Sequence, residues 1–108
     1  MKRLHIHVNT EPAQLDAATD FYSALFDHAP TKRRDGYVQW KLDDPSVNFV
    51  VESLCHDGDR PGIHHVGLET DSDMELDALR ARLRGTDAPM LDVGETTCCF
   101  ARSDKAWA

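Results

Sequence analysis

Basic residues, aromatic residues and long apolar runs are all scarce in this chain, and each scarcity excludes a class of function. Lys and Arg number 12 against 19 Asp and Glu, and the net charge of -7 argues against nucleic-acid or anionic-membrane partners. With 7% aromatic residues, the chain offers no platform for stacking bases. No apolar run approaches the roughly 20 residues that cross a bilayer, and the N-terminus does not resemble a signal peptide. We therefore expect a cytoplasmic protein that binds neither nucleic acid nor membrane.

Cysteine is also scarce, with 3 residues, but two of them, Cys98 and Cys99, are adjacent. Consecutive Cα atoms lie about 3.8 Å apart, which is below the usual disulfide range, and cytoplasmic thiols stay reduced. Two neighbouring thiols suit a thiophilic guest, such as a trivalent metalloid or Cd²⁺. The plainer interpretation is a pair of small, partly buried strand residues.

The first half of the chain predicts a strand, a helix and about three further strands. Leu4, Ile6 and Val8 alternate with two histidines, which is typical of a strand over residues 2–9. Thr10 and Pro12 then favour the start of an amphipathic helix over residues 11–27. Three strands follow in the prediction, at residues 31–34, 37–42 and 47–52.

After a polar linker at Cys55–Gly62, the pattern starts again. We expect a strand over 63–69 and a helix that begins at the capping box Ser72–Glu75 and ends at Gly85. Two strands, over 89–93 and 98–102, complete this half. On a regular strand Cys98 and Cys99 would face opposite sides, so a shared guest requires a loop or a bulge there. Thr96-Thr97 after Gly94, in the gap between the two predicted strands, is compatible with such a mobile clamp.

These two halves indicate an internal duplication within one domain of residues 1–108. A shift of about sixty positions places Thr10 on Thr70, Val8 on Leu68 and His5 on His65. Module one spans about 1–56 and module two about 62–108. The counterpart of strand 47–52 would fall after Ala108, so we expect the second module to lack its last strand.

Histidines are the candidate metal ligands, and there are 6 of them. Strand periodicity puts His5 and His7 on one face, whereas His64 and His65 are expected on opposite faces. Because the repeat aligns His65 with His5, we predict that these two share a metal. His7 is an alternative ligand, an outer partner of a ligand or an ordinary strand histidine, and we favour the last two. Two further histidines lie in predicted loops and are set aside: His28 and His56.

Two imidazoles hold a metal poorly, and the usual arrangement for non-haem Fe(II) adds one carboxylate. Glu52, at the end of a predicted strand, is the candidate third ligand. The alternative is that Glu52 is a solvated residue at a sheet edge.

Five segments together resemble the vicinal oxygen chelate superfamily, which contains glyoxalases, bleomycin-resistance proteins and dioxygenases. Within it, they resemble the cadmium-inducible proteins and the organoarsenical C–As lyases. Thr96-Thr97-Cys98-Cys99-Phe100-Ala101 followed by Asp104-Lys105 and Trp107 is the most specific part. The others are the His5 strand, Phe21–Phe26, Asn48-Phe49 and Gly62–Gly67.

The resemblance implies an α+β fold of two βαβββ modules that close around a divalent metal. In the lyases this metal is Fe(II), bound by a residue of the first strand and a histidine of the fifth, and these two positions match His5 and His65. The cysteine pair, Cys98 and Cys99, binds the trivalent arsenic of an organoarsenical, whose C–As bond is then cleaved to release arsenite. The family's third ligand is a glutamate of the eighth strand, which has no match in this sequence. The explanations are a truncated chain, completion by strand exchange with a partner, or a degenerate member.

Three functions therefore compete. The first is an Fe(II)-dependent C–As lyase, and the second is a non-catalytic protein that binds cadmium or arsenite through its cysteines. The third is a generic glyoxalase-like isomerase or dioxygenase, which needs no cysteine pair. An open strand edge at the end of module two also predicts a homodimer, with strand exchange as one form of it.

Overall fold

The computed structural model describes residues 2–54, 58–87, 91–98 and 101–107, with only the backbone described after residue 90. The fold is α+β, and the chain divides into two compact units, Met1–Thr70 and Asp71–Ala108. The predicted linker at Cys55–Gly62 lies inside the first unit. The expected modules of about 1–56 and 62–108 therefore stay a prediction.

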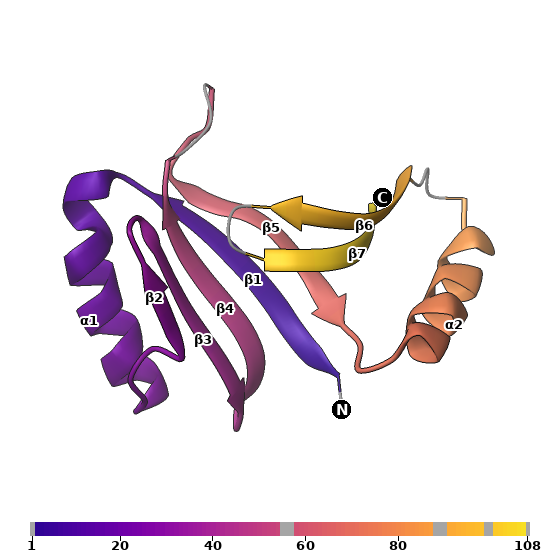
Figure 1. The fold of residues 1–108 in the computed structure, drawn as a ribbon, viewed down its shortest axis with the longest axis horizontal. Helices are drawn as coiled ribbons and strands as arrows, with labels where there is room; N and C mark the ends of the chain where they lie inside the picture. The colour runs from indigo at the N-terminus through magenta and orange to yellow at the C-terminus, as the bar shows by residue number, and fades with distance from the viewer. Residues whose placement is uncertain (1, 55–57, 88–90, 99–100, 108) are drawn as a thin grey trace. The chain divides into compact units, whose positions relative to one another are not determined.

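The first unit is a five-stranded sheet with one helix (Figure 1). Its strands are β1 (Arg3–Thr10), β2 (Lys32–Arg34), β3 (Tyr37–Asp43), β4 (Ser46–Ser53) and β5 (Gly62–Glu69), in the spatial order β2-β3-β4-β1-β5. β1 pairs in parallel with β4 and antiparallel with β5, so β1 is covered on both edges. Residues far apart in sequence therefore meet on β1.

One face of this sheet carries the apolar core. The buried side chains Val38, Trp40, Leu42, Val47, Phe49 and Val51 alternate along β3 and β4. Helix α1 (Leu15–Phe26) packs on them through apolar residues at helical spacing: Leu15, Ala18, Tyr22 and Phe26. Because strand side chains alternate, the other residues of the same strands face away from this core.

Helix α1 starts later than the sequence predicts. Pro12–Gln14 forms a 3₁₀ turn, the regular helix begins at Leu15, and Thr10 belongs to β1 instead of capping the helix. Proline fits the first turn because it has no N–H to lose there. The helix ends at Asp27, whose left-handed backbone stops it.

The second unit contains helix α2 (Asp73–Arg84) and a hairpin of β6 (Leu91–Cys98) and β7 (Ala101–Trp107). Ser72 caps α2 by accepting a hydrogen bond from the Glu75 backbone, and Gly85 ends the helix, as predicted. The predicted gap between two strands at Gly94–Thr97 is wrong, because these residues belong to β6. Two threonines favour an extended backbone, and the irregular pairing near Gly94 absorbs the glycine without breaking the strand.

No helix in the described part of the chain is long and apolar enough to cross a membrane.

Candidate metal centre

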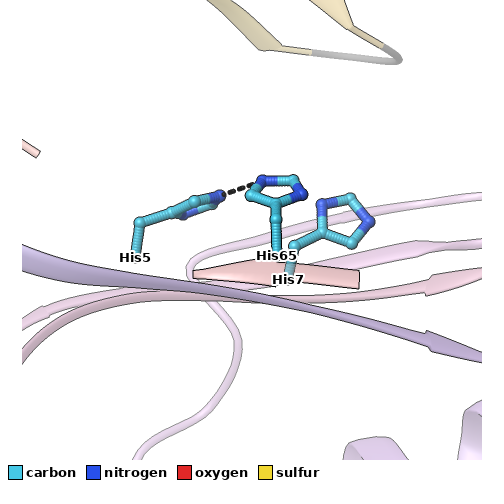
Figure 2. Close-up of side chains that lie close together, drawn as sticks. All are labelled: His5, His7 and His65. Carbon is cyan, nitrogen blue, oxygen red and sulfur yellow. Dashed lines mark hydrogen bonds between the residues drawn. The ribbon is translucent and has the colours of Figure 1, made fainter. Parts of the chain in front are cut away.

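Three histidines gather on the face of the sheet opposite the apolar core. Figure 2 shows their side chains close together on that face. His5 and His7 come from β1, and His65 comes from β5 directly opposite His7. One ring nitrogen from each histidine lies within 4.8 Å of the other two. The Nε2 atoms of His5 and His65 are 3.1 Å apart, so the structure brings together the two residues that the repeat aligns.

His5 and His7 each have an oxygen acceptor at one ring nitrogen. Nδ1 of His5 lies 3.0 Å from the backbone carbonyl of Asn48, and Nε2 of His7 lies 3.3 Å from a carboxylate oxygen of Glu52. An outer acceptor of this kind fixes the tautomer of a metal-binding imidazole and raises the basicity of its other nitrogen. These two contacts therefore fix the orientation of both rings, and one nitrogen of each ring lies in the cluster with His65.

The spacing and chemistry of these rings fit a divalent transition metal. Two imidazole nitrogens bound at about 2.0–2.1 Å to one metal lie about 3 Å apart when they are neighbours in its coordination sphere. His5 and His65 already have that separation of 3.1 Å. Imidazole suits Zn, Cu, Fe and Ni, so the donor set does not select among them.

Burial keeps His7 in the form that binds metal. His7 is 8% exposed, and desolvation by the surrounding protein lowers its pKa below the usual value for histidine. Repulsion from His64 and His5 acts in the same direction, while the Glu52 carboxylate opposes it. The net effect favours neutral imidazole, which is the ligating species.

Glu52 contacts His7 in this structure and does not belong to the group of ligand atoms that lie together. Its predicted role as a direct ligand stays a prediction, but the alternative of a solvated edge residue is wrong because Glu52 is 6% exposed. Sequence periodicity did carry a signal for the contact between Glu52 and His7. Position 52 falls on the same face of β4 as Asn48, and Asn48 is the neighbour of His5 on β1.

The prediction that His64 points away from His65 is wrong. Regular antiparallel pairing would place residue 64 opposite Val8, but the register shifts between His7 and Val8, and Ile63 takes that position. The shift is a β-bulge, in which an extra residue escapes the alternation of the strand. His64 consequently lies against His65, with their Nδ1 atoms 2.7 Å apart.

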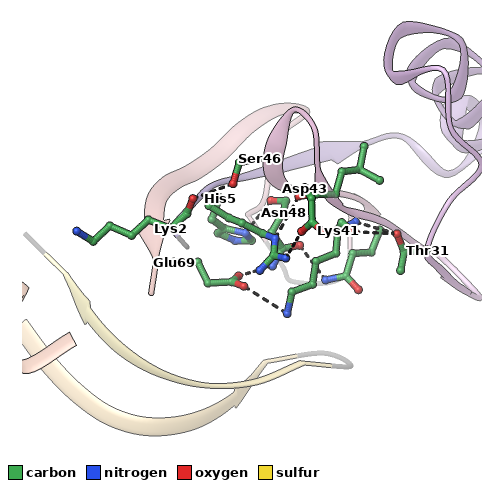
Figure 3. A network of polar contacts seen from close by, with 11 residues as sticks. Lys2, His5, Thr31, Lys41, Asp43, Ser46, Asn48 and Glu69 are labelled. Atoms are coloured by element: carbon green, nitrogen blue, oxygen red, sulfur yellow. Dashed lines mark hydrogen bonds and ion pairs between the residues drawn. The ribbon is translucent and has the colours of Figure 1, made fainter. Parts of the chain in front are cut away.

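A chain of polar contacts continues beside His5 and is drawn in Figure 3. The side-chain amide of Asn48 donates to Glu69 at 2.6 Å and accepts from Gln39 at 2.8 Å. Glu69 also pairs with Lys41 at 3.3 Å. These contacts satisfy the 8%-exposed Asn48, whose carbonyl orients His5, so they hold one wall of the centre in place.

Of the predicted thiol pair, Cys98 is the last residue of β6 and pairs with Ala101 of β7. Cys99 lies outside the described residues, as do His56 and the third cysteine, Cys55. His28 is exposed in the segment after α1 and does not join the histidine cluster.

The fold and site together define an α+β protein with a histidine-rich centre on one face of a mixed sheet. The cadmium-induced protein CadI of Mycobacterium tuberculosis is 38% identical over 109 residues, which covers 99% of this chain and 68% of that protein. The same protein of Mycobacterium bovis matches equally well. The chain therefore belongs to the family of the cadmium-induced protein CadI.

Other relatives carry a different name. The trivalent organoarsenical cleaving enzyme of a Bacillus species, strain MD1, is 32% identical over 99% of this chain and 65% of its own length. The enzyme with that name in Thermomonospora curvata is 31% identical over 86% of this chain and 61% of its own length. No protein-family model matches the chain.

Proposed function

We propose that this protein cleaves the C–As bond of trivalent organoarsenicals and releases arsenite, with a divalent metal, Fe(II), held by His5 and His65. The observation that carries the proposal is the cluster of His5, His7 and His65, in which the first two rings are already oriented from outside. The names of relatives at 31–32% identity support the choice of substrate. Bound iron would supply the oxygen-dependent oxidation that breaks the bond.

The protein's own residues have two tasks in this proposal. His5 and His65 hold the metal as neutral imidazoles, and His7, whose ring Glu52 fixes, stands beside them as an outer partner or alternative ligand. The thiols of Cys98 and Cys99 bind the trivalent arsenic, because a soft thiolate prefers a soft metalloid. Each As–S bond forms as an As–OH bond of the hydrated arsenical breaks, and the thiol proton leaves with that hydroxide as water, so the cysteines need not be ionised beforehand.

We propose further that the fold is that of the vicinal oxygen chelate superfamily. Support comes from the order of elements: β1, α1, β2, β3 in the first half and β5, α2, β6, β7 in the second follow the same sequence of strand, helix, strand, strand. Among the described strands, β5 pairs with β1 alone, which favours a homodimer that covers its outer edge, by strand exchange or otherwise. We place the protein in the cytoplasm, where its thiols stay reduced.

The test is a turnover assay on the purified protein, loaded with Fe(II) without oxygen and then given a trivalent methyl or phenyl arsenical and air. We expect released arsenite, measured by chromatography with elemental detection, and its loss in His65→Ala and in the Cys98→Ser/Cys99→Ser double variant. His28→Ala is the matched control. Arsenite release that survives without added metal or without both thiols would overturn the proposal.

A second function is carried by the relatives named cadmium-induced, which match at 38% identity. In this alternative the cysteine pair sequesters Cd²⁺ or arsenite and no bond is broken. Calorimetric titration with Cd²⁺ separates the two. Tight binding that is lost in the double cysteine variant, together with no arsenite from any organoarsenical, would favour sequestration over cleavage.

A further inference from the structure

The β-bulge in β5 places a fourth histidine against the metal centre. In a regular strand, His64 would face the apolar side with Val8, but the bulge leaves it outside the pairing. Its ring centroid lies 5.0 Å from that of His65 and 5.5 Å from that of His7. His64 is exposed, so it is not packed in the core.

The contacts of His65 differ from those of the other two rings. His5 and His7 each have an oxygen acceptor at one ring nitrogen, contributed by β4. On His65 the corresponding atom is Nδ1, since Nε2 is the atom that faces His5. The group at Nδ1 is Nδ1 of His64, at 2.7 Å. One outer partner for each of the three rings is therefore present in the structure.

We propose that His64 is a positioning residue that holds His65 in the orientation and tautomer needed to bind the metal. This inference rests on the metal centre of the proposed function and not on the arsenical substrate. The bulge is the structural device that makes it, because without the extra residue β5 would present only His65 to this face.

Before metal binds, one set of neutral tautomers supplies a donor and an acceptor for each hydrogen bond that links His64, His65, His5 and the Asn48 carbonyl. His64 donates through Nδ1 to Nδ1 of His65, His65 donates through Nε2 to Nε2 of His5, and His5 donates through Nδ1 to the Asn48 carbonyl. Each donor has one acceptor, and no ring needs a positive charge.

Metal binding requires the direction of these hydrogen bonds to reverse at His65. The ligating Nε2 atom must give up its proton, and the neutral ring then carries that proton on Nδ1. His64 becomes the acceptor at Nδ1 and holds its own proton on Nε2. The number of protons on the rings is unchanged, and imidazole is suited to the task because it is able both to donate and to accept through the same atom.

The test measures metal affinity and tautomer state, neither of which depends on turnover. Co(II) titration followed by visible absorption compares wild type, His64→Ala, His64→Gln and the control His28→Ala. We expect His64→Ala to weaken Co(II) binding about 10–100-fold, the usual cost of losing an outer partner. The absorption bands should keep their shape, and His64→Gln should recover most of the affinity because its amide oxygen accepts from His65.

Histidine ¹⁵N chemical shifts of the wild type give a second readout without any substitution. We expect Zn²⁺ to move the His65 proton from Nε2 to Nδ1 and the His64 proton from Nδ1 to Nε2. Unchanged affinity in His64→Ala, altered Co(II) bands in that variant, or a His64 tautomer that ignores zinc would overturn the inference. A wild type that binds no Co(II) would overturn it together with the metal centre, whereas a failure to cleave arsenicals would leave it standing.

Discussion

The two faces of the five-stranded sheet are built from the same strands, yet they obey different rules. On one face, apolar side chains of β3 and β4 pack under helix α1 and need only to fill space. On the other face, the buried His7, Asn48 and Glu52 each require a specific polar partner. The comparison teaches that stability and metal binding are separable here, because alternation assigns them to opposite sides of one strand.

The largest effect is expected on the apolar face, from Trp40→Ala. Trp40 is 0% exposed, contacts Tyr22 and Phe26 of α1, and donates its indole N–H to the His28 carbonyl. Truncation of a buried tryptophan costs about 3–5 kcal/mol of the free energy of unfolding. Urea denaturation checks this value against Phe21→Ala, which removes a 62%-exposed ring of α1. That variant should lose far less free energy of unfolding. Equal losses in the two variants would contradict the assignment of the core.

The matching change on the polar face is Glu52→Gln. It removes the carboxylate that orients His7 while keeping the volume of the side chain, so we expect Co(II) affinity to fall about 10–100-fold with little change in unfolding. Titration compares it with Asp20→Asn, an exposed carboxylate of α1. A change in the Co(II) absorption bands would instead make Glu52 a direct ligand, as the sequence predicts.

Alternation also explains how much of this site could be read from the sequence. It placed His5 and His7 on one face, and the repeat offset of about sixty positions aligned His65 with His5. The bulge at His64 could not be read, because it exists only in the pairing between β1 and β5. The same holds for the Asn48 carbonyl, since a backbone acceptor leaves no mark on residue identity. At Gly94–Thr97 the sequence was misleading, because it left these residues between two strands, whereas they pair with β7 as part of β6.

The pH dependence of unfolding should also distinguish the two faces in metal-free protein. Burial lowers the pKa of His7, so the unfolded state takes up a proton there before the folded state does. Below the ordinary histidine pKa of about 6.5, the free energy of unfolding should therefore decrease as the pH falls. Denaturation of wild type and His7→Gln is compared from about pH 7.5 to about pH 5.5. The measurement is the difference between the two proteins in the slope of the free energy of unfolding against pH. An equal or steeper slope in the variant would contradict the shift.

The smallest effects concern the pair formed by Glu69 and Lys41, and they test what a partner on the polar face is worth. Lys41→Met removes a half-exposed ion pair and should change the free energy of unfolding by about 0–1 kcal/mol. Glu69→Leu removes the acceptor of the buried Asn48 amide and should cost about 1–3 kcal/mol, because that amide loses its hydrogen bond. Urea denaturation of both variants decides the order. If Lys41→Met costs as much as Glu69→Leu, the charge of the pair matters more than the hydrogen bond to Asn48. Ion pairs would then stabilise the polar face more than the hydrogen bonds of buried polar groups do, which is the opposite of what we infer from Asn48 and Glu52.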